Sequence, residues 1–311
     1  MTDPEDIKPE DIKDAAASPP ASPEAADEAP RRVDWLGEVR GLLVMLLAVV
    51  AFHSFVAKPF YIPSISMMPN LLVGDRLIVS KWPYGWSWVS ASFHVLKRGD
   101  TRVLPRTPEY GDVVIVVPPD RDVDYIKRVV ALPGDRIAVT GGHIVLNGKR
   151  VPRDVEPPLQ IPADDELRCE YGACYAAFAA YRTRLPEGRD VYELPVERET
   201  LPNGASYLII DHMRQPLDDM AEITVPAGHV FLMGDNRDHS ADSRAEAGPI
   251  ENGLGGPVPL ADVGGRAEFV TFSLDGSESW NPATWWRALR EGRAWRTLRP
   301  RMDAPAQQAR P

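Results

Sequence analysis

The chain has 311 residues, of which 44% are hydrophobic, and a formal net charge of −10, so it is long enough to bury a sizeable core in one large domain or two small ones. The charge is uneven, because residues 1–30 hold nine acidic groups and two lysines and so account for −7 of the total. The acidity of the chain therefore says little about the partners of its folded part.

Residues 1–34 are expected to form a disordered tail. They are rich in Pro and Ala, as in AAASPPASPEAADEAP, and residues 1–30 contain no aromatic residue. Such a composition excludes a packed core, because it cannot bury enough apolar surface to offset the entropy of ordering the chain.

An apolar run, GLLVMLLAVVAFHSFVA, follows at Gly41–Ala57 between Arg40 and Lys58. Its length is at the short end of what spans a bilayer. A buried globular helix would show polar residues at helical spacing, and a cleaved signal peptide would lie nearer the N-terminus and end at an A-x-A-like site. The run therefore favours a single membrane anchor within residues 35–58.

The charges beside the run predict its orientation. Arg31, Arg32 and Arg40 precede it and only Lys58 follows closely. By the positive-inside rule the tail stays in the cytoplasm, and everything after residue 58 lies outside it. We expect a single-pass protein of the bacterial inner membrane with its body on the periplasmic side.

An exported body bears on the two cysteines, Cys169 and Cys174, which enclose EYGA. No further Cys or His ligands cluster nearby, so we expect no metal site. In an oxidising compartment the pair favours a small disulfide loop, with two unpaired buried cysteines as the alternative.

Beyond the anchor the sequence is typical of strands. Asn147-Gly148 marks a hairpin, 31 prolines argue against long helices, and no stretch between residues 59 and 280 has the pattern of a long amphipathic helix. We expect a mostly β body. The predicted strands lie in DRLIVSKW, GDVVIVVPP, DYIKRVVAL, DRIAVTGGHIVLNGKRV, SYLIIDH, HVFLMGD and RAEFVTFS.

The candidate chemistry begins in IPSISMMPNLLVGD, where Ser64 and Ser66 lie one residue apart. A serine nucleophile needs a base. His239 in GDNRDHSADSR is one candidate, but triad members normally come from separate segments, whereas the Asp and Ser residues here are its immediate neighbours.

Lys127 in DYIKRVVALPG is the other candidate base. It would have to be neutral, so burial must lower its pKa from about 10.4. Strand alternation places it on one face with Tyr125 and Val129, where desolvation could act. A lysine at a strand edge that faces water is the plainer alternative.

Four segments, IPSISMMPNLLVGD, YGDVVIV, DYIKRVVALPGD and MGDNRDHSADSR, occur in the order and spacing of the bacterial type I signal peptidases, and GPVPLADVGGRAEFVTFS resembles the segment that follows in that family. The resemblance covers residues 41–274 apart from a variable middle. It implies a membrane-anchored Ser-Lys serine endopeptidase on a largely β fold. Such an enzyme removes signal peptides from exported preproteins after a small-x-small, typically Ala-x-Ala, site.

The resemblance also assigns roles to residues. The nucleophile falls on Ser66, the general base on Lys127, and an oxyanion-binding hydroxyl on Ser64, beside the backbone N–H of Ser66. The serine that orients the lysine and a structural acid–base pair fall on Ser240 and on Asp242 with Arg244. The walls of a shallow substrate pocket fall on Phe60, Ile62, Met67, Leu71, Val114, Tyr125 and Ile126, for each of which plain core packing is the alternative.

The sequence departs from the family pattern at three positions. Residue 65, usually Gly, is Ile65; residue 70, often Thr, is Asn70; and residue 239, often Asn, is His239. A β-branched residue disfavours positive φ, so the turn at Ile65 must use an ordinary backbone conformation. If that turn is strained, replacing Ile65 with Gly should raise the rate, whereas side-chain packing of Ile65 in the substrate groove would give the opposite sign.

The expected organisation is a catalytic β core at 59–136 and 227–278, an inserted β-rich subdomain at 137–226, and a basic, Trp-rich segment at 279–311. That last segment suits an anionic bilayer surface, and a solvated tail with packed tryptophans fits as well. Nucleic acid is not expected as a partner, because a segment outside the cytoplasm would not meet it. We expect a monomer without a cofactor.

Two other functions are compatible with parts of the sequence. A catalytically weak membrane-tethered β scaffold could bind exported chains, but a decayed enzyme would be expected to lose Ser66, Lys127 or Ser240. A self-cleaving Ser-Lys protease of the repressor type is disfavoured by the anchor and by GDNRDHSADSR.

Overall fold

The structure is a computed structural model that describes residues 34–91, 96–167 and 173–303. The described residues divide into two units between Val44 and Met45, within the first helix. That helix, α1 (Trp35–Phe55), begins after Asp34, whose side chain accepts a hydrogen bond from the N–H of Gly37 (3.0 Å). No residue of α1 is buried, and the helix is long and apolar enough to cross a membrane.

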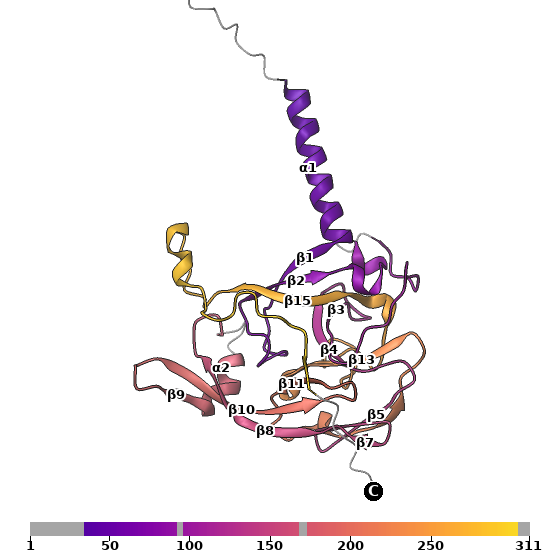
Figure 1. Ribbon diagram of the computed structural model, residues 1–311, viewed down its shortest axis with the longest axis vertical. Coiled ribbons are helices and arrows are strands. Elements are labelled where there is room, and N and C mark those ends of the chain that lie inside the picture. Colours follow the sequence, from indigo (N-terminus) through magenta and orange to yellow (C-terminus); the bar gives the residue numbers. More distant parts are fainter. Residues whose placement is uncertain (1–33, 92–95, 168–172, 304–311) are drawn as a thin grey trace, which may run out of the picture. The chain divides into compact units, whose positions relative to one another are not determined.

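The second unit is mostly β, as the sequence predicts. Its largest sheet has seven strands in the order β1-β2-β15-β3-β4-β13-β14, and β1, β2 and β15 lie side by side in Figure 1. The bounds of these strands are β1 Ala57–Tyr61, β2 Asp75–Ser80, β3 Val113–Val116, β4 Tyr125–Ala131, β13 His229–Met233, β14 Val258–Pro259 and β15 Val263–Ser273.

Two smaller sheets contain the remaining strands. One has the order β16-β11-β10-β8 with β9 paired to β10, and its strands are β8 Arg153–Pro162, β9 Arg182–Arg184, β10 Asp190–Thr200, β11 Ala205–Ile209 and β16 Arg301–Met302. The other has the order β12-β5-β6-β7, with β5 Arg136–Thr140, β6 His143–Leu146, β7 Lys149–Arg150 and β12 Met220–Thr224.

Helices in this unit are short. Within its described residues the only α-helix after α1 is α2 (Ala173–Phe178), so the expectation of no long helix between residues 59 and 280 is confirmed there. The single turns of 3-10 helix are η1 Trp82–Tyr84, η2 Trp88–Ser90, η5 Ala179–Tyr181, η6 Pro216–Asp218, η7 Arg237–His239, η8 Leu260–Asp262 and the longer η9 Pro282–Arg287.

The region 137–226 packs directly on the seven-stranded sheet. Val130 of β4 and Phe231 of β13 share one buried cluster with Ile137, Ile144 and Tyr207. Strands β5, β6, β11 and β12 therefore contribute to the same hydrophobic core as β4, the strand that holds Lys127.

The segment KWPYGWSWVSASF, residues 81–93, is rich in aromatic residues and packs in part against the body. Tyr84 and Trp88 are buried, and they donate hydrogen bonds to Asp112 (2.7 Å) and Asp262 (2.9 Å). Trp82 is exposed, and Phe93 lies outside the described residues. Two of these aromatic residues are thus committed to the body.

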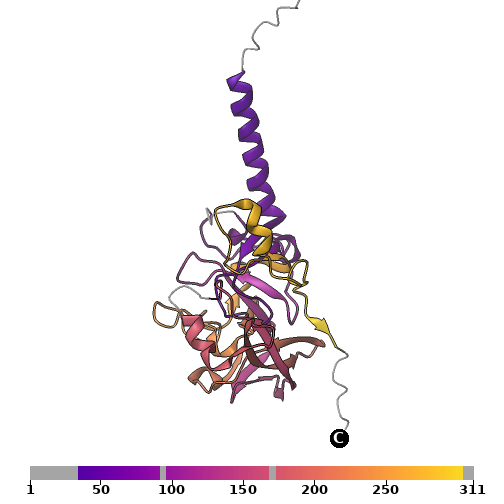
Figure 2. The same cartoon turned by 90° about the vertical axis from the view of Figure 1, so that its left-hand side faces the viewer.

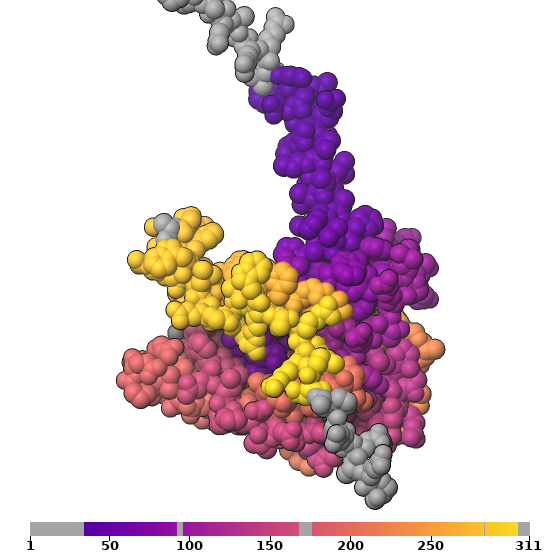
Figure 3. Space-filling view, in the orientation of Figure 1, coloured from indigo at the N-terminus to yellow at the C-terminus, as the bar shows by residue number. Residues whose placement is uncertain are grey.

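The segment after β15 is also tied to the body. It crosses one face, shown in yellow in Figure 3, and includes β16, which pairs with β11; Figure 2 shows the same yellow segment from the side. Arg290 binds Asp164 through two hydrogen bonds of 2.7 and 2.8 Å, and Arg293 binds the buried Asp75. Its four tryptophans remain exposed: Trp280, Trp285, Trp286 and Trp295.

The Arg293–Asp75 ion pair yields a stability prediction. Asp75 is fully buried, and besides Arg293 (Nε–Oδ1 3.2 Å) it accepts the N–H of Leu72 (2.9 Å). Arg293→Ala leaves a buried carboxylate without its counter-ion and should lower the free energy of unfolding by about 3–5 kcal/mol in urea titrations.

Arg301→Ala is the matched control, because Arg301 pairs with Asp303 (3.0 Å) in the same segment but is 72% exposed. It should change the free energy of unfolding by less than about 1 kcal/mol. Equal effects of the two substitutions would contradict a special role for the buried pair.

Candidate active site

The loop between β1 and β2 carries Ser64 and Ser66, and its two ends are fastened to each other. The N–H of Ile62 donates to the carbonyl of Asp75 (2.9 Å), and the N–H of Gly74 donates to the carbonyl of Ile62 (3.0 Å). Between these bonds Met67, Met68 and Leu71 are fully buried. The apolar residues thus fix the loop to the core, and the two serines are left at the edge of a cavity.

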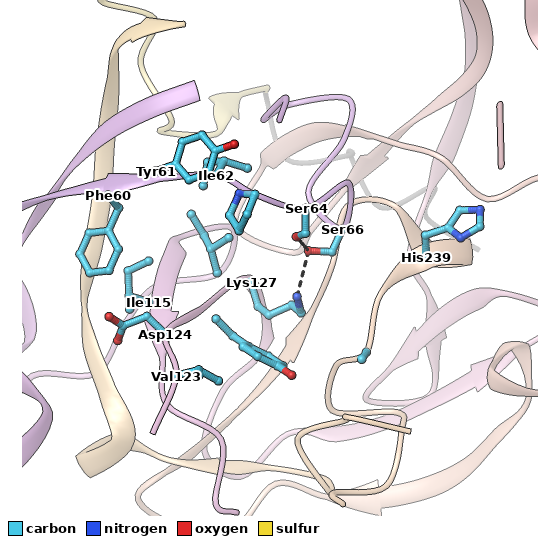
Figure 4. Close-up of a pocket in the computed structure, with 14 residues that line it drawn as sticks. Phe60, Tyr61, Ile62, Ser64, Ser66, Ile115, Val123, Asp124, Lys127 and His239 are labelled. Carbon is cyan, nitrogen blue, oxygen red and sulfur yellow. Dashed lines mark hydrogen bonds between the residues drawn. The ribbon is translucent and has the colours of Figure 1, made fainter. Parts of the chain in front are cut away.

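Lys127 reaches this loop from β4. Its Nζ donates a hydrogen bond to Ser66 Oγ (3.1 Å), and the oxygens of Ser64 and Ser66 are 3.2 Å apart (Figure 4). Both Lys127 and Ser66 are buried, and the amine lies 5.3 Å from the centroid of the Tyr125 ring. Three groups that the sequence singled out therefore form one continuous chain of contacts.

Burial gives Lys127 the properties of a base. Removal of the amine from water lowers its pKa from 10.5 to about 8, and the neighbouring carboxylates of Asp242 and Asp235 oppose that shift only in part. At pH 7 about a tenth of such a lysine is unprotonated, and this neutral form can accept a proton. The structure thus supplies the desolvation that the strand pattern predicted.

A second buried lysine lies outside this arrangement. Lys81 follows β2, and burial, with a further contribution from Lys58, lowers its pKa to about 8 as well. Within the described residues its amine makes no hydrogen bond or ion pair. A depressed pKa alone therefore does not single out Lys127; its contact with Ser66 does.

The segment Gly234–Arg244 lies beside the loop between β1 and β2, which is called the nucleophile loop below because the sequence predicts Ser66 as the nucleophile. Arg244 binds both oxygens of Asp242 (3.0 Å each), both side chains are buried, and Asp242 also accepts the N–H of Gly234 (3.0 Å). Burial acts to raise the pKa of Asp242, but the Arg244 charge and these hydrogen bonds lower it below its usual range. The predicted acid–base pair is thus present and ionised, and it fixes the shape of the segment.

Ser240 is close to the site but not bonded to the lysine. Its Oγ is buried and has no hydrogen-bond partner among the described residues. A Cβ at Gly234 would overlap this Oγ and would lie 2.5 Å from the carbonyl oxygen of Ser66. Only glycine therefore allows residue 234 to pack between Ser240 and the nucleophile loop.

Two residues of this segment were missed in the sequence. Asn236 donates from its backbone N–H to the carbonyl of Ser66 (3.1 Å) and from Nδ2 to the carbonyl of Ile65 (3.2 Å). Asp235 is fully buried and binds Arg128 through two hydrogen bonds of 2.7 and 2.6 Å. The motif GDNRDHSADSR drew attention to the region, but nothing in the sequence shows which carbonyls Asn236 meets.

A cavity of about 420 Å³ opens beside Ser66 and is mostly apolar. Four predicted wall residues line it, namely Phe60, Ile62, Tyr125 and Ile126, together with Tyr61, Pro63, Ile115, Val123, Asp124 and Ala241, which were not predicted. The Phe60 and Ile115 side chains lie on the same side of the Ser66–Lys127 contact in Figure 4.

Met67, Leu71 and Val114 do not line this cavity. Each is fully buried, the first two in a cluster with Leu77 and the third in a cluster with Val129. Met67 and Leu71 share their cluster with Phe60, Ile62, Ile115 and Ile126, which do line the cavity, so the assignment of these three residues to the pocket wall stays a prediction.

The position of His239 does not suit a base for Ser66. It lies at the cavity margin, but its ring packs edge-on against Phe178, with centroids 6.1 Å apart, and points away from Lys127 in Figure 4. Burial lowers its pKa, and its Nε2 has no hydrogen-bond partner in the described part of the chain. The geometry favours Lys127 over His239 as the group that contacts Ser66.

Ile65 packs away from the cavity. Its φ is not positive, and its side chain is buried in a cluster with Phe178, Tyr192 and Ile210. The turn therefore shows no left-handed backbone that glycine would relieve, and Ile65 does not fill the substrate groove. The isoleucine attaches the nucleophile loop to strands β10 and β11 and to α2.

The predicted disulfide falls outside the described residues. Cys169 lies within 168–172, and only the backbone of Cys174, in α2, is described. The pairing stays a prediction.

Comparison with known proteins finds relatives that share one description. The family model described as signal peptidase, peptidase S26, matches residues 35–272. A signal peptidase I from Rickettsia typhi is 33% identical over 78% of this chain and 79% of its own length, and one from Pseudomonas aeruginosa is 34% identical over 74% and 69%. A solved signal peptidase I from Enterococcus faecalis aligns with 52% of this chain and 97% of its own at 21% identity and a TM-score of 0.25, on which no argument is built.

Ile65 gives the testable prediction of this site. Ile65→Gly removes a buried side chain and adds backbone freedom, so it should lower the free energy of unfolding by about 2–5 kcal/mol, and Ile65→Val by about 0.5–1.5 kcal/mol, in urea titrations. Val155→Ala, on β8 at a side chain 85% exposed, is the control and should stay within about 0.5 kcal/mol. A stabilised Ile65→Gly protein would restore the idea of a strained turn.

Proposed function

This chain belongs to the peptidase S26 family of signal peptidases, and we propose that Ser66 is its nucleophile and Lys127 its general base. The chain is a serine endopeptidase that removes signal peptides from preproteins. The 3.1 Å hydrogen bond between the buried Lys127 amine and Ser66 Oγ is the observation that carries the assignment of residues.

The chemistry follows from these contacts. Neutral Lys127 accepts the proton of Ser66 as Oγ attacks the scissile carbonyl carbon, so that a C–O bond forms and the carbonyl π electrons move to the oxygen. The Ser64 hydroxyl and the Ser66 N–H stabilise that oxyanion, a contribution typically worth about 2.7–4 kcal/mol per donor. The Lys127 ammonium then protonates the leaving amine, and the peptide bond breaks to give an acyl-enzyme.

Water completes the cycle by the same route. Lys127 removes a proton from the water that attacks the ester, and Ser66 recovers its proton when the ester bond breaks. Ser240, whose buried hydroxyl has no partner in the described residues, is proposed to orient the Lys127 amine while it carries the extra proton. Asp242 and Arg244 are proposed to hold that segment in place.

The cavity suits an extended substrate with small side chains. Within the described residues β1 pairs only with β2, and β4 pairs with β13 only from Arg128 onwards, so both strands have free backbone groups beside the cavity. A preprotein segment can add as a strand there. The apolar walls then restrict the positions before the cut to small residues, typically Ala-x-Ala.

The anchor explains where this chemistry happens. We propose that α1 crosses the bacterial inner membrane once, with the N-terminus in the cytoplasm and the body on the periplasmic side, where signal-peptide cleavage sites emerge. The exposed tryptophans of the C-terminal segment support contact of the body with the lipid surface. The enzyme is proposed to act as a monomer.

The pH dependence tests the dyad. If Lys127 is the base, kcat/KM for an Ala-x-Ala peptide should rise with pH up to about pH 8, because the protonated amine cannot accept a proton. Lys127→Met and Ser66→Ala should each lower kcat at least about 100-fold without unfolding the protein, and His239→Ala should keep most of the rate.

Lys81→Met is the matched control for that profile, because Lys81 is equally buried and also has a pKa of about 8. Lys81→Met should leave the rise of kcat/KM with pH, the acid limb of the profile, unchanged. If Lys81→Met abolished the rise of kcat/KM with pH and Lys127→Met retained it, Lys127 would not be the general base.

The two lysines also affect stability. Each lysine binds fewer protons in the folded than in the unfolded protein between pH 8 and 10.5, so the free energy of unfolding should rise with pH in that window. The rise should be smaller in either variant.

Orientation is tested separately. Protease added to intact spheroplasts should digest the body after residue 58 and leave the N-terminal residues protected. A protected body with an accessible N-terminus would show that the chain is inserted the other way round. Immunodetection of tags at the two ends provides the measurement.

A further inference from the structure

Asn236 holds the nucleophile loop at two successive carbonyl groups. It is fully buried; its backbone N–H bonds the Ser66 carbonyl (3.1 Å), and its Nδ2 bonds the Ile65 carbonyl (3.2 Å). The Ile65 carbonyl also accepts the N–H of Met68 (3.0 Å), but Met68 belongs to the same loop and moves with it. Asn236 is therefore the contact that fixes this peptide group to the rest of the body.

The geometry of a peptide bond gives this contact a consequence for catalysis. The carbonyl of Ile65 and the N–H of Ser66 belong to one planar unit and point in opposite directions, so a group that holds the carbonyl also aims the N–H. We propose that the Asn236 side chain is a positioning residue that orients the Ser66 N–H toward the oxyanion. The inference rests on the proposed function, which makes that N–H an oxyanion donor.

Asn236 is itself rigidly placed. Its neighbour Asp235 is bound by Arg128 and by Asn70 (2.7 Å), and the Asp235 carbonyl accepts the N–H of Ile210 (3.0 Å). On the other side, Gly234 approaches the Ser66 carbonyl without a side chain. The amide that aims the donor is thus anchored to β4 and to the end of β11.

A neutral amide suits this task. A positive side chain at residue 236 would oppose protonation of the nearby Lys127, whereas an amide polarises the Ile65–Ser66 peptide without adding charge. Because the donor is set before substrate arrives, it needs no reorganisation when the oxyanion forms. Loss of the amide should therefore weaken transition-state binding and leave substrate binding nearly unchanged.

The test compares two inhibitors of one Ala-x-Ala sequence, a peptide aldehyde and the corresponding peptide alcohol. Ser66 Oγ adds to the aldehyde carbon and creates an oxyanion, with the serine proton on Lys127, whereas the alcohol cannot react. Asn236→Ala should lower kcat and aldehyde affinity by about 10- to 100-fold, and it should change KM and alcohol affinity by less than about threefold. Asn236→Asp, of equal size but without the amide donor, should show the same pattern.

Gln215→Ala is the matched control, because Gln215 donates a side-chain amide to the Arg237 carbonyl (2.7 Å) in the same segment but does not touch the nucleophile loop. It should leave the aldehyde-to-alcohol ratio within about twofold of that of the unaltered enzyme. Both inhibitors bind only folded protein, so partial unfolding lowers both affinities together and leaves the ratio unchanged.

The outcomes separate the two ideas. If the unaltered enzyme and Ser66→Ala bind the aldehyde equally well, the proposed nucleophile is wrong. If Ser66→Ala loses the preference for the aldehyde but Asn236→Ala and Asn236→Asp keep it, only the role of Asn236 is refuted. Equal losses for aldehyde and alcohol would refute it as well, because they would show a general loosening of the groove.

Discussion

Exclusion of water from the Lys127 amine is the constraint on which the proposed chemistry depends. β4 lies between β3 and β13 in the seven-stranded sheet, and every residue of β4 after Tyr125 is buried, so its side chains are covered on both faces. Burial affects two adjacent residues of this strand, Lys127 and Arg128, in opposite ways. Lys127 is poised to lose its charge, whereas Arg128 keeps its charge and is neutralised by Asp235. A guanidinium could not replace the amine, since it remains protonated in proteins.

The nucleophile loop meets a different demand, because it must be rigid although it is a loop. Its rigidity comes from elements far away in the sequence: Ile65 packs on the strands of region 137–226, and Asn236 bonds two of its carbonyls. The region that varies in the family pattern is thus in direct contact with the residue between the two serines. In this chain an isoleucine fills the space that the usual glycine would leave to neighbouring side chains.

The sequence predicted those parts of the structure that depend on local pattern. Strands β3, β4 and β13, with their runs of β-branched and apolar residues, lie where they were expected. β8 and β10 were missed, because Pro157, Pro158 and several glutamates obscure the pattern, and their pairing is with distant segments.

The same distinction between local pattern and distant contacts applies to the residues of the site. Ser66 and Lys127 stand in motifs with a chemical meaning, and the structure brings them into contact. By contrast, an apolar residue beside a nucleophile can face the cavity, as Ile62 does, or the core, as Met67 does, and no local rule distinguishes the two. The role of Asn236 depends on which carbonyls a distant loop presents, which only the folded chain reveals.

The position of Arg293 in the chain has a consequence for synthesis. The residue that neutralises Asp75, at the end of the nucleophile loop, lies 218 positions further along the sequence. A ribosome that is still making the chain therefore exposes Ser66 and Lys127 long before this ion pair can form. The ion pair can form only after Arg293 has been synthesised, so a shorter partial chain holds Asp75 without its counter-ion.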